Sequence, residues 1–212
     1  MKQAVADYDF NTYVRALGDF ANEDLSAFFF DIRKDSLYCD AATDPKRMAY
    51  RTVLDTLFHA LVRWAAPVLV FTSEEVWGTR YPEAGSVHLL EWPEIGDWLN
   101  PAIADRWVAA REVRRLVNEE VEPLRRAKTI GSSLEAEVQL NTIPPVAQRL
   151  EGLDLAELFI TAEVSFGSKT PDKALIAVCR TTNQKCGRCW RHLPEVADDG
   201  GLCTRCEGVV ND

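Results

Sequence analysis

Apolar residues recur every three or four positions through the first part of the chain, which is the pattern of amphipathic helices. The first such stripe runs from Phe10 to Ile32 and predicts one long helix. The polar residues Asn22–Asp24 fall inside this stripe, so a break in the helix is expected there.

A second stripe, from Met48 to Trp64, predicts a helix whose two ends are marked by the sequence. Asp44 precedes it as the expected N-cap, and Pro45 occupies the first helical position, where its missing N–H is not needed. Pro67 cannot continue the helix without removing a hydrogen bond, so the helix is expected to end or kink there.

Two further helices are predicted before residue 130. The stretch TSEEVW is expected to form a short helix capped by Thr72 or Ser73, with acidic residues near its positive end. Pro101 is expected to open a long helix that reaches about Lys128 and kinks at Pro123.

The hydrophobic pattern changes after residue 133. Residues 134–140 alternate apolar and polar side chains and predict a half-buried strand. Residues 144–153 predict a short helix, and residues 158–166 and 173–181 predict two further strands. The chain therefore switches from helices to a small unit of mixed structure.

The predicted fold class is mainly α with a small α+β part. A helical bundle is expected over residues 1–130, a small α/β junction domain over 131–182 and a ribbon over 183–212. The composition, with 47% hydrophobic and 27% charged residues, is that of an ordinary globular protein. The apolar runs are too short to span a bilayer and no targeting segment is visible, so we expect a cytoplasmic protein without membrane contact.

Two Cys-x-x-Cys pairs near the end of the chain have the spacing of a zinc ribbon. The expected ligands are Cys186, Cys189, Cys203 and Cys206. A pair of redox dithiols would open a helix in a thioredoxin-like unit, and two disulfides would require an oxidising compartment; neither context is seen. One zinc ion is expected, and it is structural because four protein ligands leave no open position.

Basic residues surround the first cysteine pair of an otherwise acidic chain, whose net charge is −9. An acidic protein is not a general nucleic-acid binder, but it can meet RNA at a local basic spot. Lys185, Arg188 and Arg191 form such a spot beside Trp190. The alternative is that these bases neutralise the negative zinc–thiolate centre.

The other histidine and cysteine residues that could take part in catalysis or metal binding are interpreted as structural. His59 lies on an apolar stripe and is expected to be a core or boundary residue, while Cys39 and Cys179 are expected to be small buried residues. The sequence contains no glycine-rich phosphate loop, serine elbow or pair of catalytic carboxylates. The residues alone therefore indicate no active site.

Several stretches, taken in order, resemble the C-terminal region of bacterial isoleucyl-tRNA synthetases, of the class I aminoacyl-tRNA synthetase family. Residues 8–40 and 61–77 are similar to the helical anticodon-binding domain, and residues 86–95 and 128–140 to the segments that follow. Residues 185–206, with both cysteine pairs, are similar to the zinc ribbon at the isoleucyl C-terminus. Valyl enzymes instead carry a long coiled-coil arm, and methionyl enzymes carry zinc near the catalytic domain.

The resemblance implies a piece of a ligase that joins isoleucine to its tRNA with ATP. The class I signature motifs and an editing domain are absent from this sequence, so ATP and Mg²⁺ belong only to the absent catalytic domain. The piece is expected to be an inactive monomer that binds the anticodon region of isoleucine tRNAs. Trp190 would stack on an RNA base while Lys185, Arg188 and Arg191 approach phosphates; alternatively, Trp190 packs the ribbon against the α/β unit.

Two rival interpretations belong to other functional classes. A DNA-repair glycosylase can end in a similar ribbon, but it requires an N-terminal nucleophile and a basic face, and the acidic first part of the chain argues against DNA binding. No catalytic motif in the sequence contradicts a free-standing helical adaptor with a structural zinc ribbon. Isoacceptor preference in tRNA binding separates the adaptor from the synthetase piece.

Overall fold

The structure is a computed structural model that describes residues 1–96, 98–142, 144–168 and 174–211. The chain forms two compact units. The first unit contains Met1–Leu37 and Ala42–Trp98, and the second contains Tyr38–Ala41 and Leu99–Asp212. The division does not follow the predicted boundary at residue 130, and the three domains expected from the sequence stay a prediction.

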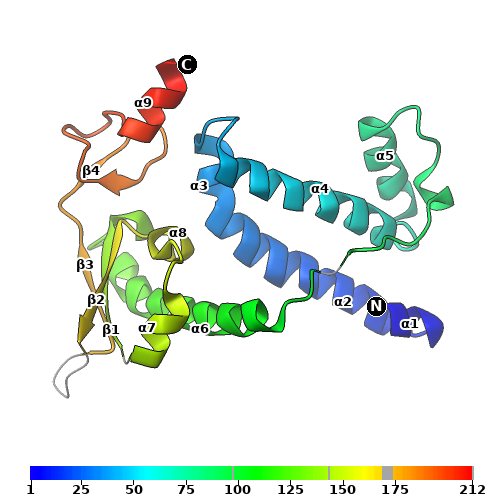
Figure 1. The fold of residues 1–212 in the computed structure, drawn as a ribbon, viewed down its shortest axis with the longest axis horizontal. Helices are drawn as coiled ribbons and strands as arrows, with labels where there is room; N and C mark the ends of the chain where they lie inside the picture. The colour runs from blue at the N-terminus through cyan, green and yellow to red at the C-terminus, as the bar shows by residue number, and fades with distance from the viewer. Residues whose placement is uncertain (97, 143, 169–173, 212) are drawn as a thin grey trace. The chain divides into compact units, whose positions relative to one another are not determined.

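The first unit begins with a short helix, α1 (Lys2–Ala6), and a long helical path. This path consists of α2 (Phe10–Asp19), a π-helical stretch η1 (Phe20–Phe30) and α3 (Asp31–Cys39). The predicted break near Asn22 is therefore wrong, and Figure 1 shows one helical path running through this region. Asn22 and the residue after it are exposed, so a continuous helix accommodates these polar side chains at its solvent face.

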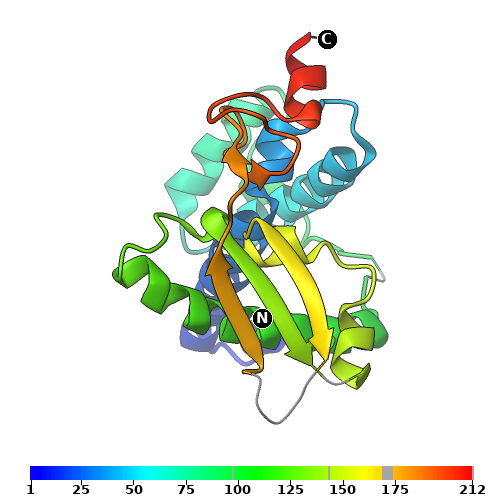
Figure 2. The ribbon, with the colours of Figure 1, turned by 90° about the vertical axis from the view of Figure 1, so that its left-hand side faces the viewer.

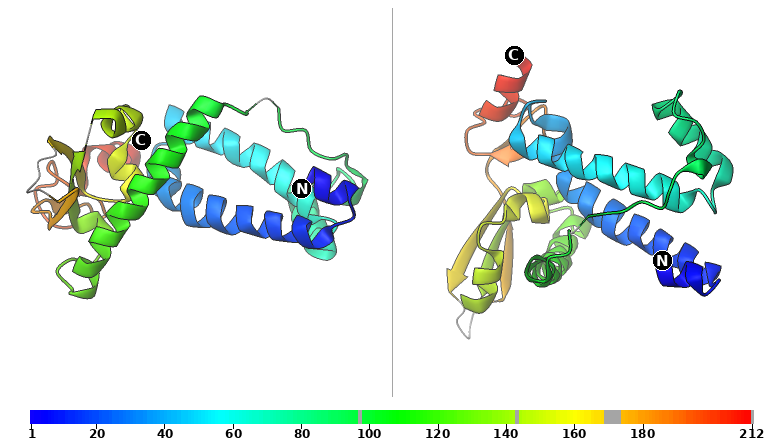
Figure 3. Two further views of the ribbon diagram at one scale, coloured as in Figure 1. Left: turned by 90° about the horizontal axis from the view of Figure 1, so that it is seen from below. Right: turned by 45° about the vertical axis from the view of Figure 1, so that its right-hand side comes forward.

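Helix α4 (Pro45–Ala65) runs alongside α2 (Figure 1 and Figure 3). The prediction of its start is confirmed, because the Asp44 carboxylate accepts from the backbone N–H groups of the second and third helical residues. The Tyr13 hydroxyl, in a side chain only 2% exposed, donates to the carbonyl of Trp64 at 2.5 Å. This bond joins α2 to α4.

Helix α5 (Val70–Arg80) starts earlier than predicted. Its N-cap position is Leu69, which makes no side-chain capping bond, and Ser73 is buried inside the helix. The expected cap at Thr72 or Ser73 is therefore wrong. The packing of α5 lies further along the helix, where Trp77 enters a buried cluster.

Apolar side chains from α4, α5 and the 3₁₀ turn η2 (Val87–Leu89) form this cluster. Its buried members are Val62, Ala66, Trp77 and Val87. His59 lies at its edge, with Nε2 3.0 Å from the Tyr81 hydroxyl oxygen and the two rings stacked. The interpretation of His59 as a boundary residue is confirmed.

The second unit is built around α6 (Pro101–Arg126), which Asn100 caps and which continues through Pro123 to its end. A three-stranded sheet packs against it, with β1 (Ala136–Thr142) in the middle (Figure 2). The 3₁₀ turn η3 (Ser133–Glu135) precedes β1, so that strand starts later than predicted.

β1 pairs in parallel with β2 (Glu163–Ser168) and antiparallel with β3 (Ile176–Arg180). A parallel pair needs a crossover, which α7 (Pro144–Leu150) and α8 (Leu155–Phe159) supply. The prediction of a strand over 158–166 is therefore wrong in its first part, because residues 158 and 159 belong to α8 and β2 begins only at Glu163. Asp154 caps α8, and its carboxylate accepts from the backbone N–H of Glu157 at 3.0 Å.

The strand predicted over 173–181 is shorter in the structure, and its first residue, Lys173, lies outside the described residues. The chain then passes into a small hairpin, β4 (Gln184–Lys185) and β5 (His192–Leu193), and ends with α9 (Thr204–Asn211). In the part of the chain that the structure describes, each helix is too short or too polar to cross a membrane.

Candidate metal centre and nucleic-acid interface

The four predicted ligand cysteines lie together in the structure. The sulfur atoms of Cys186, Cys189, Cys203 and Cys206 all lie within 4.8 Å of one another, and all four residues are buried. Four sulfurs bound tetrahedrally to zinc at about 2.3 Å would be separated by about 3.8 Å. The Sγ atoms of Cys189 and Cys203 are 3.9 Å apart, so the donor set fits one zinc ion with four thiolate ligands.

The two cysteine pairs occupy different local structures. The first pair lies in the turn between β4 and β5, where the Cys186 N–H donates to the Arg191 carbonyl at 2.9 Å. Cys203 stands directly before α9, and Cys206 lies in its first turn. The hairpin therefore encloses the first cysteine pair, while the second pair belongs to the start of α9.

Backbone amides are arranged to stabilise negative sulfur. Burial acts to raise the pKa of Cys186, but backbone N–H groups, including that of Cys203 at 3.3 Å, lower it to about 6. Burial raises the pKa of Cys189 and of Cys203. A metal ion is therefore needed to hold the latter two as thiolates at neutral pH.

Gly187 and Gly200 allow the loop before α9 to approach the turn that carries Cys186 and Cys189 closely. The Gly187 N–H donates to the Gly201 carbonyl and the Gly200 N–H donates to the Lys185 carbonyl, both at 2.9 Å. A Cβ on Gly187 would lie 2.4 Å from the Gly200 carbonyl oxygen. Gly200 itself has φ +85°, which a residue with a side chain rarely adopts.

The turn presents an aromatic ring and a cation together at its surface. Trp190 is 61% exposed and has a φ of +65°, while its N–H donates to the Cys186 carbonyl at 3.0 Å. The Lys185 ammonium nitrogen lies 5.4 Å from the centre of the indole ring. Arg191 follows as a half-buried residue. The exposure of Trp190 does not support the alternative in which it packs the ribbon against the α/β part.

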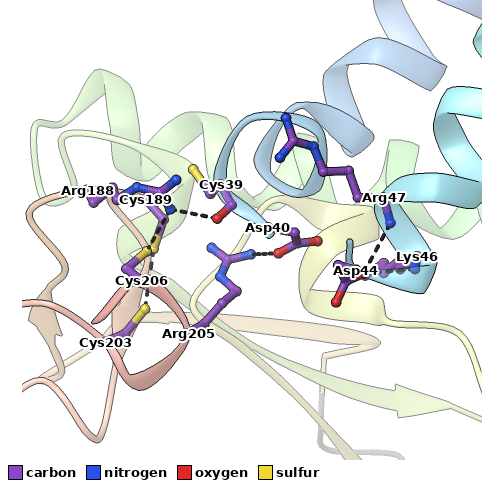
Figure 4. A network of polar contacts seen from close by, with 10 residues as sticks. All are labelled: Cys39, Asp40, Asp44, Lys46, Arg47, Arg188, Cys189, Cys203, Arg205 and Cys206. Atoms are coloured by element: carbon purple, nitrogen blue, oxygen red, sulfur yellow. Dashed lines mark hydrogen bonds and ion pairs between the residues drawn. The ribbon is translucent and has the colours of Figure 1, made fainter. Parts of the chain in front are cut away.

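Arg188, in the same turn, extends toward Cys39 and Cys206 (Figure 4). Its Nη1 atom donates to the Cys39 carbonyl at 2.6 Å and lies 3.5 Å from the sulfur of Cys206. The hydrogen bond to Cys206 raises the pKa of the Arg188 guanidinium. These contacts favour charge neutralisation at the metal centre for Arg188, and its contact with RNA stays a prediction.

A second arginine, Arg205, lies at this centre and was not predicted from the sequence. Arg205 donates from Nη1 to the Asp40 carboxylate at 2.8 Å, and Cys39 packs against the cluster of ligand cysteines. Cys39, expected to be a small buried residue, is half-buried against the ligand cysteines. Asp40 and Arg205 lie 165 positions apart, and no local pattern connects them.

Cys179 is also not the buried residue that was expected. It is exposed on β3, where alternate side chains point to opposite faces and the buried Ile176 lies on the other one. The alternation of side chains between the two faces of this short strand is the sequence signal that could have predicted the exposure of Cys179.

Comparison with known families agrees with this arrangement. Residues 1–140 match the anticodon-binding domain of tRNA ligase, and residues 183–208 match the zinc finger found in FPG and IleRS. The chain belongs to this anticodon-binding family. The zinc-finger match covers all four clustered cysteines and, together with their geometry, fits one structural zinc ion.

The relatives of this anticodon-binding chain are isoleucine–tRNA ligases. It is 54% identical to the enzyme of Zymomonas mobilis over its whole length, 49% identical to that of Gluconobacter oxydans over 92% of the chain, and 43% identical to that of Agrobacterium fabrum over 91%. The chain spans only 21–23% of the length of these proteins, in their C-terminal part. A free-standing adaptor is not favoured by these matches.

Proposed function

We propose that the chain is the part of an isoleucine–tRNA ligase that holds the anticodon region of the tRNA. The complete enzyme would use ATP and Mg²⁺ to attach isoleucine to its cognate tRNA in the cytoplasm, through a catalytic domain outside this sequence. The chain itself would be a monomer that binds tRNA but not DNA or membranes. Support comes from the two family matches and from relatives that carry this activity in their names.

The exposed turn of the ribbon is the observation that carries the proposal. Trp190 offers a large aromatic face to solvent, with the Lys185 ammonium beside it. Bases in an anticodon loop are unstacked enough to stack on such a ring, while a nearby cation meets the phosphate backbone. Zinc would hold the turn rigid through Cys186 and Cys189, so that the ring is ordered before RNA arrives.

We assign the predicted RNA contacts to different roles on this basis. Trp190 would supply stacking, and Lys185 and Arg191 would supply phosphate contacts. Arg188 already donates to Cys39 and Cys206, so its predicted phosphate contact has the weakest support of the four. Zinc does no chemistry here: when bound, it closes the ribbon through the four cysteines.

Binding to a panel of tRNAs for different amino acids tests the proposal. The zinc-loaded chain should shift isoleucine tRNAs at lower protein concentration than other tRNAs, and should not retard duplex DNA of equal charge. Equal affinity for isoleucine tRNAs and all the other tRNAs would contradict the proposal and favour an adaptor. The chain should also show no isoleucine-dependent pyrophosphate exchange, because residues for adenylate formation are not in this sequence.

A further inference from the structure

Two arginines of the ribbon reach the same four-residue segment, Tyr38–Ala41, which belongs to the same compact unit as the ribbon. Arg188 donates to the Cys39 carbonyl at 2.6 Å, and Arg205 donates to the Asp40 carboxylate at 2.8 Å. Figure 4 shows both side chains extended toward this segment. The ribbon and the segment are thus joined at two neighbouring points.

The contacts at these points are shielded from solvent. The Asp40 side chain is 9% exposed and that of Arg205 is 30% exposed, so their pairing is not a fully hydrated surface ion pair. The Cys39 side chain packs against the cluster of ligand cysteines and is partly buried there. Apolar packing and charge pairing therefore act on the same segment.

Arg188 connects the segment to the metal centre itself. Its Nη1 lies within reach of the Cys39 carbonyl and of the Cys206 sulfur, which is one of the proposed ligands. Cys39 is the last residue of α3, where backbone carbonyls lack partners within the helix and a cation is favourable. A metal-bound thiolate on the other side is a negative acceptor for the same guanidinium.

We propose that Arg188 and Arg205 are positioning residues that dock the ribbon on the segment Tyr38–Ala41, and that Arg188 makes this docking depend on the zinc centre. Arg188 then acts on RNA only indirectly, by holding in place the turn that presents Trp190. The docking involves contacts within the chain and is independent of RNA binding. Its consequence for tRNA rests on the proposed function.

Alkylation of Cys39 measures the docking directly. The zinc-loaded full chain is treated with iodoacetamide, and modification of Cys39 and Cys179 is followed by peptide mass spectrometry; zinc protects the four ligands. Cys179 is exposed and serves as the internal reference. Arg188→Ala and Arg205→Gln should each speed alkylation of Cys39 several-fold while that of Cys179 is unchanged. Arg191→Ala, in the same turn, is the control and should change neither rate.

Whether alkylation of Cys39 becomes faster or slower distinguishes a change in its exposure from a change in the charge around it. Loss of a positive charge near Cys39 disfavours its thiolate and would slow alkylation, so a faster reaction reports loss of packing. Zinc is measured on each variant. If Arg188→Ala releases zinc, the alkylation rate of Cys39 in Arg205→Gln supplies the test of docking. Zinc release from both variants would show that the two arginines serve only to hold the metal, which would overturn the proposal. Unchanged Cys39 protection in a zinc-loaded variant also overturns the proposal.

The salt dependence of tRNA binding gives a second test of Arg188. A positioning role predicts weaker binding with an unchanged dependence on salt, whereas loss of a phosphate contact would lower the slope by up to about one. A lower slope for Arg188→Ala overturns the indirect role. Failure of the wild-type chain to prefer isoleucine tRNAs contradicts the proposed function but leaves the alkylation result standing.

Discussion

At the scale of single residues, the ribbon places Trp190 in a backbone conformation that its side chain disfavours. Its φ of +65° lies in the left-handed region, which glycine adopts most readily. The bond from its N–H to the Cys186 carbonyl fixes the turn that imposes this conformation. Strained backbone that presents an exposed aromatic ring is consistent with selection for binding over stability.

Replacing Trp190 separates binding from folding. Trp190→Ala should weaken binding of isoleucine tRNA by about 1–3 kcal/mol, the usual effect of losing one base–aromatic stack. Trp190→Gly should lose the same binding while relieving the backbone strain, so its ribbon should be at least as stable as that of the alanine variant. Titration with fluorescently labelled tRNA gives the affinity, and metal analysis should give one zinc per chain for both variants. Loss of zinc from both would assign Trp190 a packing role.

Gly187 provides a residue-scale prediction about the fold. A Cβ there would lie 2.4 Å from the Gly200 carbonyl oxygen, a backbone atom that cannot move without opening the loop. Gly187→Ala should therefore weaken zinc retention in competition with a chelator. Gly208→Ala is the matched control, because nothing lies within 4 Å of its new Cβ and alanine favours the helix α9. Equal zinc retention by the two variants would contradict the close approach of the two loops.

At the scale of elements, the ribbon depends on the ionisation of its cysteines. In the metal-free chain, whose ribbon is unfolded, free cysteine thiols have the ordinary pKa of about 8.5 and are mostly protonated at neutral pH. In the folded ribbon, burial raises the pKa of Cys189 and of Cys203 further, so only the metal holds them as thiolates. Zinc displaces the bound protons, so its apparent affinity should rise with pH above neutrality. Calorimetry in two buffers of different ionisation enthalpy should detect proton release at pH 7. A binding enthalpy independent of the buffer would contradict these protonation states.

Removal of zinc tests which elements fold without it. Chelation should unfold the ribbon, because ligation supplies most of the folding free energy of so small a unit. The helices of residues 1–98 have their own buried cluster around Trp77, and α6 packs on the sheet, so most of the helical circular dichroism should remain. Hydrogen exchange should rise across residues 183–211 and in Tyr38–Ala41. A collapse of the whole helical signal would show that the parts do not fold independently.

Local signals account for the elements that could be predicted from the sequence. Asp44 and Pro45 marked the start of α4, and the spacing of the cysteines indicated the metal site, because both depend on neighbours along the chain. The cap predicted for α5 is wrong because the helix begins at Val70, before both candidate residues. The strand predicted over 158–166 begins later than expected because Asp154 caps α8 and residues 158 and 159 belong to that helix. The pairing of Arg205 with Asp40 is purely tertiary and left no pattern to find.

At the scale of the whole molecule, the chain combines a helical unit and a unit that ends in the metal ribbon. The anticodon-binding match covers residues 1–140 and so includes the first unit and part of the second. The ribbon match, residues 183–208, is separate from it. Recognition of the anticodon by the complete chain would therefore combine contacts from two parts that the sequence places far apart.

An anticodon exchange tests the central claim most directly. The isoleucine anticodon loop is transplanted into a tRNA of another specificity, and binding of the zinc-loaded chain to the chimera and its parent is compared. The chimera should bind more tightly than its parent, and Trp190→Ala should remove most of this gain while affecting the parent tRNA little. An affinity that follows the tRNA body regardless of the anticodon loop would contradict the account.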